Sequence, residues 1–90
     1  MRSVEKVRII SCQVQYVPLG TNDVNVDVEK VLTLIEESGL NYEPGPMTTT
    51  ISGNPERVFH LIQRIETEMS ENNRKFTMTI LLSNECGCQK

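Results

Sequence analysis

The sequence lacks a cluster of positive charge, and this excludes one large class of partners. Nine lysines and arginines stand against twelve aspartates and glutamates, the net charge is −3, and the basic residues are scattered along the 90-residue chain. Proteins that bind nucleic acids neutralise phosphates with basic side chains gathered on one surface. We therefore expect no nucleic-acid partner.

A long apolar run is also missing. The first ten residues, MRSVEKVRII, contain acids and bases and are typical of neither a signal peptide nor a membrane span. We expect the chain to stay in the cytosol, without a membrane partner. Its three cysteines, Cys12, Cys86 and Cys88, are an odd number in a chain without an export signal, which favours reduced thiols over a disulfide framework.

Residues that could form a catalytic set are few. The one histidine, His60, lies beside the apolar residues of an expected helix, and no acid is spaced so as to indicate a catalytic pair with it. Because a nucleophile needs a positioned base, we predict no enzyme. Cys86 and Cys88 could bind a soft metal ion, but a tetrahedral site needs about four ligands, and we expect Cys12 in the core. We therefore predict no metal site and no cofactor, and metal handling by the two C-terminal cysteines stays the less favoured alternative.

The first half of the chain has a strand pattern followed by a helix pattern. Residues 4–17 are rich in β-branched and apolar side chains and are bounded by Pro18, which predicts a strand. Within residues 21–40 the apolar positions recur three and four apart, which predicts a helix. We expect Asn25 to be its N-cap and Gly39 to follow its last turn.

The second half of the chain predicts four elements: two short strands, a helix and a last strand. The segment LNYEPGPMTTTISG, residues 40–53, reads as two strands joined by a Pro-Gly-Pro turn, since its prolines exclude a helix. Residues 54–73 predict a second helix, with Asn54 as the N-cap and Pro55 in its first position. The alternation in KFTMTILLS, residues 75–83, predicts the last strand.

This order of elements predicts an α+β fold. Two split βαβ units favour a ferredoxin-like βαββαβ sandwich, with one four-stranded antiparallel sheet and two helices on one face. We expect residues 1–84 to form a single domain and residues 85–90 to be a flexible C-terminal tail.

In such a fold one face of the sheet is left uncovered. Alternation places the apolar residues of the first and last strands toward the helices: Ile10, Cys12, Val14, Phe76, Met78, Ile80 and Leu82. It leaves on the other side Ile9, Ser11, Gln13, Gln15, Thr77, Thr79 and Leu81. These amides and hydroxyls suit a polar heterocycle or a wet interface, while a solvated face and self-association are the alternatives.

Three short motifs together resemble a known family. They are PLGT at residues 18–21, SGLNY at residues 38–42 and PMTTTISG at residues 46–53, within a similarity that covers about residues 7–83. The chain resembles the MTH1187/YkoF-like family, also called the thiamine-binding protein or UPF0045 family. The resemblance implies a ferredoxin-like subunit that assembles into dimers and commonly tetramers and binds thiamine or its hydroxymethylpyrimidine moiety without catalysis.

A thiamine-like ligand defines which side chains are candidates. Its aminopyrimidine needs amide or hydroxyl partners and a flat apolar surface, and its thiazolium needs a carboxylate or an aromatic face. The candidate ligand-binding residues are Ser11, Gln13, Thr21, Tyr42, Glu43, Thr48 and Thr49.

Several candidates have an alternative role. Gln13 could equally form a hydrogen bond across a subunit interface, and Glu43 beside a Pro-Gly turn could be solvated. Thr49 shares its parity with Ile51, which favours an inward threonine. The Gly-Thr turn that contains Thr21 could present amides to an anion, but it lacks the glycines and lysine of a P-loop. The sequence thus predicts a non-catalytic small-molecule binding protein, or alternatively a homo-oligomeric interaction module without a physiological small ligand.

Overall fold

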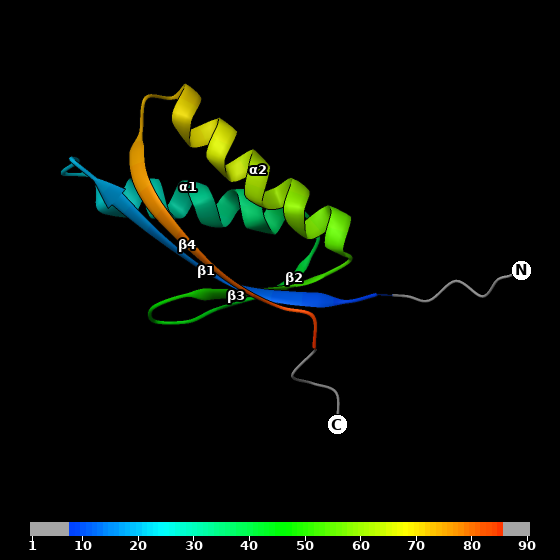
Figure 1. The fold of residues 1–90 in the computed structure, drawn as a ribbon. Coiled ribbons are helices and arrows are strands. Elements are labelled where there is room, and N and C mark those ends of the chain that lie inside the picture. Colours follow the sequence, from blue (N-terminus) through cyan, green and yellow to red (C-terminus); the bar gives the residue numbers. More distant parts are fainter. Residues whose placement is uncertain (1–7, 86–90) are drawn as a thin grey trace, which may run out of the picture.

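Four strands and two helices make up the computed structural model, which describes residues 8–85 (Figure 1). In chain order the elements are β1 Ile10–Leu19, α1 Val24–Glu37, β2 Asn41–Pro44, β3 Thr49–Gly53, α2 Pro55–Glu71 and β4 Lys75–Ser83. The predicted βαββαβ order and the α+β ferredoxin-like fold are confirmed.

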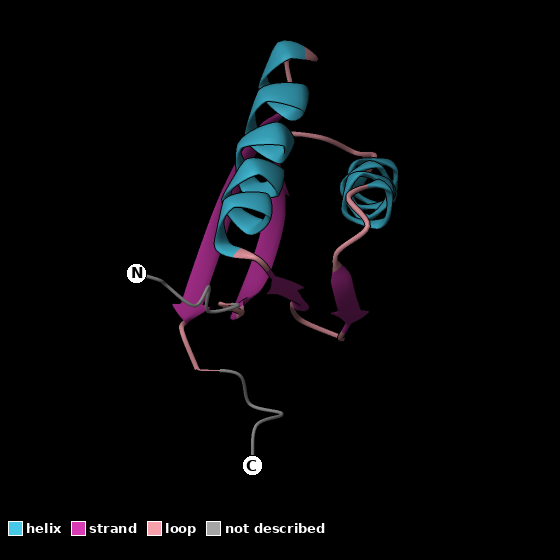
Figure 2. Cartoon of the chain, turned by 90° about the vertical axis from the view of Figure 1, so that its right-hand side faces the viewer, coloured by secondary structure: helices cyan, strands magenta, loops and turns pink. Residues whose placement is uncertain are grey.

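The strands form one antiparallel sheet in the order β2-β3-β1-β4. Both helices lie on the same side of this sheet, and in Figure 2 α1 is seen nearly end-on beside α2. β1 and β4 pair along nine positions, from Ser11 opposite Ser83 to Leu19 opposite Lys75, and they extend past the short β2–β3 hairpin. At the Leu19 end of the β1–β4 ribbon, β1 therefore has a strand neighbour, β4, on one side only.

The bounds of β1 differ from the prediction at both ends. Arg8 and Ile9 are described but lie outside the strand, because the partner strands end opposite Ile10 and Ser11. Residues 4–7 of the predicted strand lie outside the described residues. At the other end β1 continues through Pro18 to Leu19. A proline is tolerated there because β3 pairs with β1 only as far as Val14, so no ladder on that side loses a donor.

The start of α1 also differs from the prediction, and Asn25 is not its N-cap. The helix begins at Val24 after Asp23, whose side chain makes no capping hydrogen bond. The turn before it is fixed by Thr21, whose hydroxyl oxygen accepts a hydrogen bond from the Asp23 backbone N–H at 2.9 Å. Gly39 does follow the helix as predicted, with a φ of +76° that favours glycine.

The N-terminus of α2 confirms the prediction. Pro55 is its first residue, and the Asn54 side chain accepts hydrogen bonds from the backbone N–H groups of Glu56 and Arg57. One face of α2 is buried through Val58, Leu61, Ile65 and Met69.

The core lies between the helices and the covered face of the sheet. Its central strand contributes Ile10, Cys12 and Val14, all buried as predicted. From β4, Phe76, Met78 and Ile80 are half-buried against this core. Leu82 lies opposite Cys12 in register but is exposed, because the edge strand is covered less completely at that end.

The opposite side of the sheet carries no helix, and we call it the open face. Register places on it residues from all four strands: Ser11, Gln13, Gln15 and Val17 of β1, Asn41 and Glu43 of β2, Thr50 and Ser52 of β3, and Thr77, Thr79 and Leu81 of β4. It is mainly amide and hydroxyl with some apolar area, as the sequence predicted.

Candidate functional site

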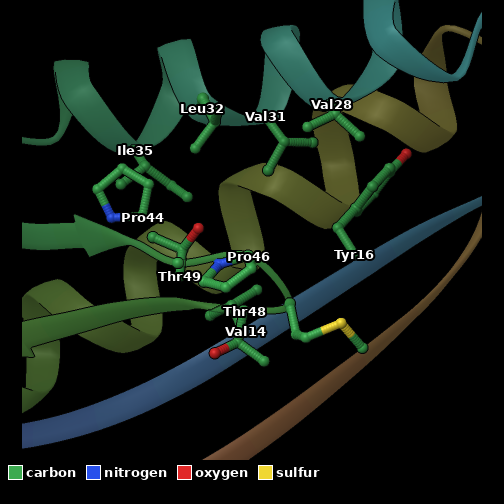
Figure 3. A pocket seen from close by; sticks show the side chains of 12 residues that line it. Val14, Tyr16, Val28, Val31, Leu32, Ile35, Pro44, Pro46, Thr48 and Thr49 are labelled. Carbon is green, nitrogen blue, oxygen red and sulfur yellow. The ribbon is translucent and has the colours of Figure 1, made fainter.

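A cavity of about 210 Å³ lies on the covered side of the sheet, between α1 and the turn of the β2–β3 hairpin. Figure 3 shows α1 on one side of it, the hairpin on another, and β1 along its floor. Its lining consists of Val14, Tyr16, Val28, Val31, Leu32, Ile35, Pro44, Gly45, Pro46, Met47, Thr48 and Thr49. The cavity is therefore separate from the open face.

The hairpin turn has a shape that its sequence fixes. Two prolines restrict the backbone, and the Gly45 N–H donates a 2.8 Å hydrogen bond to the Thr48 carbonyl oxygen. A Cβ added to Gly45 would lie 2.9 Å from that same oxygen, so the turn accepts only glycine without rearrangement. Met47, at the tip, is 72% exposed and forms the rim of the cavity.

Another glycine of the same motif positions the hairpin against the core. A Cβ on Gly53 would lie 2.5 Å from Cδ2 of Leu40, a buried residue between α1 and β2. The missing side chain allows Leu40 to pack directly on the end of β3. Gly53 thus has a packing role, outside the cavity lining.

The polar groups of the cavity are neutral. Thr48 and Thr49 bring hydroxyl groups, and Tyr16 brings an aromatic ring, while none of the twelve lining residues carries a charge. Apolar side chains of α1 form the opposite wall (Figure 3). A concave, mostly apolar site with few polar groups is the usual form of a small-molecule site.

Tyr16 occupies one end of the cavity (Figure 3), close enough to the ion pair of buried Asp27 and partly exposed Arg74 for both charges to act on its hydroxyl. Its ring stacks on Phe76 with a centroid distance of 4.9 Å and an interplanar angle of 26°. Desolvation by burial, and then the Asp27 charge, raise the pKa of Tyr16, while Arg74 acts in the opposite direction. The hydroxyl is therefore neutral at physiological pH.

Two further clefts lie at the ends of the helix pair. One of about 270 Å³ is lined by Glu37, Arg57 and Arg64 among others, and one of about 280 Å³ by Asp27 and Arg74 among others. In both, charged side chains pair with each other or cap a helix end, since Arg57 donates to the Ser38 carbonyl oxygen at 2.8 Å. Of these three sites, the α1–hairpin cavity is the one whose lining has no charged side chain, and it is the best candidate for a neutral ring.

Five of the seven predicted ligand-binding residues fall into two groups. Thr48 and Thr49 line the cavity, and Thr49 faces inward as its parity indicated. Ser11, Gln13 and Glu43 lie together on the open face, where Gln13 and Glu43 both oppose Thr50.

Two candidates belong to neither group. Tyr42 opposes Ile51 on the covered side of the sheet but is not among the cavity residues, and Thr21 is engaged in the turn before α1.

Sequence reasoning missed Tyr16 and the apolar residues of α1 as site residues. A signal for Tyr16 was present, because it continues the inward alternation of Cys12 and Val14. Val28 and Leu32 belonged to the expected apolar face of the helix, but the sequence offered no signal that they would border a cavity rather than fill the core.

Within residues 8–85, no group of three or more His, Cys, Asp or Glu side chains could hold a metal ion. Cys86 and Cys88 lie outside the described residues, as does the predicted tail after Glu85. His60 is exposed on α2, and Cys12 is buried in the core. Neither helix of the described chain combines the length and apolarity that crossing a bilayer requires.

A comparison with family models matches residues 12–84 to the family described as thiamine-binding protein. The match covers both helices and all but the first two residues of β1. No curated protein sequence matches the chain.

Solved structures with the same fold have low sequence identity. A proposed thiamine biosynthesis/salvage protein from Thermotoga maritima has a TM-score of 0.78 at 17% identity, over 88% of this chain and 86% of that one. A domain of unknown function from Bacillus cereus has a TM-score of 0.77 at 22% identity, over 90% and 80% of the two chains. A Streptococcus pneumoniae protein has a TM-score of 0.77 at 13% identity, over 90% and 91%. At these identities the structures support the fold.

Proposed function

The chain belongs to the thiamine-binding protein family, and we propose that it binds thiamine or a related pyrimidine in the cavity between α1 and the β2–β3 hairpin. The observation that supports this most is the composition of the lining, which combines neutral hydroxyls, an aromatic ring and apolar walls without a charged side chain. Such a lining receives a flat heterocycle without desolvating an ion.

The size of the cavity limits what it can enclose. Pockets for drug-sized ligands typically measure roughly 300–1,000 Å³, whereas this cavity measures about 210 Å³. One heterocyclic ring fits this volume better than both rings of thiamine. The second ring would lie beyond the rim at Met47, in solvent or against another subunit.

Binding without a chemical step is part of the proposal. General acid–base and nucleophilic catalysis need acids, bases or activated nucleophiles near the ligand. The lining residues include no Asp, Glu, His, Cys, Lys or Arg. Capture and release of an unchanged ligand is the function this lining supports, and we place it in the cytosol as part of the proposal.

Assembly of identical subunits is the second part of the proposal, as a dimer or a tetramer. Its support is the open face, where Val17 and Leu81 remain exposed among hydroxyls and amides. This mixture is common in interfaces between subunits. If this surface were the whole function, the chain would be a homo-oligomeric interaction module without a small ligand.

Isothermal titration with thiamine and with hydroxymethylpyrimidine tests the ligand. We expect saturable heat for both, and no heat at millimolar ligand would contradict the proposal. Thr49→Val keeps the shape of the side chain and removes one hydroxyl, so affinity should fall roughly three- to tenfold.

Gln13→Leu is the matched control for the location of the site, because Gln13 lies on the open face. If the ligand binds in the cavity, the affinity of Gln13→Leu for it, per subunit, should stay within about twofold of that of the unaltered chain. A larger loss in Gln13→Leu than in Thr49→Val would move the site to the open face and leave the cavity without a ligand.

A further inference from the structure

Tyr16 stands out among the cavity residues as the aromatic one. It extends from β1 toward α1 at one end of the cavity (Figure 3), and the other lining side chains are aliphatic, hydroxyl, proline, glycine or methionine. A role for Tyr16 in ligand binding rests on the proposed function, whereas the position of its side chain does not.

One side of the Tyr16 ring is already covered. Phe76 stacks on it at 4.9 Å and 26°, and Phe76 is not among the residues that line the cavity. The surface that Tyr16 contributes to the cavity is thus the part of the ring that Phe76 leaves free. An aromatic ring held against a second ring is a stiff surface, because rotation of either side chain would break the stack.

The hydroxyl of Tyr16 is not available to the cavity. Its oxygen is buried without a hydrogen-bond partner, as is Oδ2 of the neighbouring Asp27. Asp27 itself is 2% exposed and its Oδ1 lies 3.4 Å from Nε of Arg74. The hydroxyl end of the ring is therefore buried, within the electrostatic influence of Asp27 and Arg74, and what the cavity meets is ring carbon.

We infer that Tyr16, supported from behind by Phe76, is the stacking surface that selects a flat heteroaromatic ring in the α1–hairpin cavity. The bound ring would lie against Tyr16, with the Thr48 and Thr49 hydroxyls and the hairpin backbone around its edge. Stacking favours planar, electron-poor heterocycles over saturated rings of the same size. This names Tyr16 as the specificity-determining residue and one aromatic heterocycle as the ligand class.

The composition of the chain allows a direct test. It contains two tyrosines and no tryptophan, so Tyr42→Phe leaves Tyr16 as the sole tyrosine. When hydroxymethylpyrimidine is added to this variant, the ring-proton NMR signals of Tyr16 should shift upfield with saturation, because a stacked ring shields them. Saturable binding by titration without any shift of these signals would overturn the inference.

Two substitutions separate the ring from the hydroxyl. Tyr16→Phe keeps the ring, and we expect its affinity for hydroxymethylpyrimidine to stay within about threefold. Tyr16→Leu removes the ring, and affinity should fall roughly tenfold or more. Equal losses in both variants would mean that the hydroxyl is the contact, which contradicts stacking.

The outcomes also separate this inference from the proposed function. If the unaltered chain binds neither probe, the proposed function fails. If it binds them and Tyr16→Leu binds equally well, only the role of Tyr16 fails. Should Tyr16→Leu not fold, the NMR measurement on Tyr42→Phe still decides, because it leaves position 16 unchanged.

Discussion

Cys12 combines burial with an ionisable thiol at the centre of the sheet. It is 2% exposed, and desolvation by burial raises its pKa above the ordinary value of 9.0. Above that pH the unfolded chain releases the proton first, while the folded chain keeps it. The unfolded state then binds fewer protons, so stability is fully present below pH 9.0 and falls as pH rises toward the folded pKa.

We therefore predict that the free energy of unfolding in urea falls as pH rises above 9.0 and that Cys12→Ala reduces this slope. The variant should also be less stable at pH 7, because it leaves space in the core. Urea titrations at closely spaced pH values measure both effects. An identical alkaline slope with and without Cys12 would assign the loss to other groups, such as Tyr16.

Asp27 lies in the first turn of α1, and it is buried there although its side chain is a carboxylate. It is 2% exposed, and its partner Arg74 is 39% exposed in its side chain. Sequence periodicity could not reveal this, because the arginine comes from the turn before β4, 47 positions later, and only the packed fold brings the two together.

Removing one partner of this pair should cost stability. Arg74→Met leaves the Asp27 carboxylate buried without a cation, and we expect a loss of about 1–3 kcal/mol, since Arg74 is partly exposed and water replaces some of its effect. Asp27→Leu combined with Arg74→Met should recover part of that loss. Chemical denaturation of these two variants and of the unaltered chain measures it. A double variant less stable than Arg74→Met alone would contradict this account, because the unpaired Asp27 carboxylate would then not be the source of the loss.

At the scale of elements, the two helices start in different ways. The Asn54 side chain accepts hydrogen bonds from two backbone N–H groups of α2, at 2.9 Å and 3.4 Å, whereas Asp23 makes no side-chain capping bond to α1. The sequence predicted the first start because Asn-Pro is a strong local signal. It misplaced the second by two residues because Thr21 shapes the preceding turn.

This contrast predicts unequal effects of alanine at the two helix starts. Asn54→Ala should lower the free energy of unfolding by about 1 kcal/mol, because two N–H groups lose their acceptor. Asp23→Ala is the matched control and should change it by less than about 0.5 kcal/mol. Thermal or urea unfolding compares them. Equal losses at the two positions would show that the Asp23 side chain caps α1 in solution.

Element existence, strand parity and the hairpin turn were all predictable from local patterns, and the cavity was not. Alternation correctly separated Cys12 and Val14 from Ser11 and Gln13. The cavity instead depends on how far α1 stands from the hairpin, a distance set by packing between segments remote in sequence. For this reason the sequence directed attention to the open face, and of its candidates only Thr48 and Thr49 line the cavity.

At the scale of the whole molecule, the half-covered sheet has two surfaces with different properties. The covered side holds the core and the cavity, and the open face holds exposed apolar groups between polar ones, with Leu81 65% exposed opposite Gln13. The proposed ligand site and the proposed assembly surface lie on opposite faces, so each can be altered separately. The free-energy changes caused by one substitution on each face should then add, since residues without shared contacts behave independently.

Leu81→Glu tests the assembly surface. A carboxylate in the middle of an interface between identical faces would be desolvated and repelled by its own copy, so the variant should be monomeric in sedimentation velocity while the unaltered chain sediments as a dimer or tetramer. Phe59→Glu is the control, because Phe59 is similarly large and 51% exposed but lies on α2. If Phe59→Glu is the variant that dissociates, subunits meet through the helices.

Titration of monomeric Leu81→Glu with hydroxymethylpyrimidine then shows whether one subunit or two form the site. Retained affinity means that one subunit holds the ring alone. A loss of more than tenfold means that a second subunit closes the cavity at the Met47 rim.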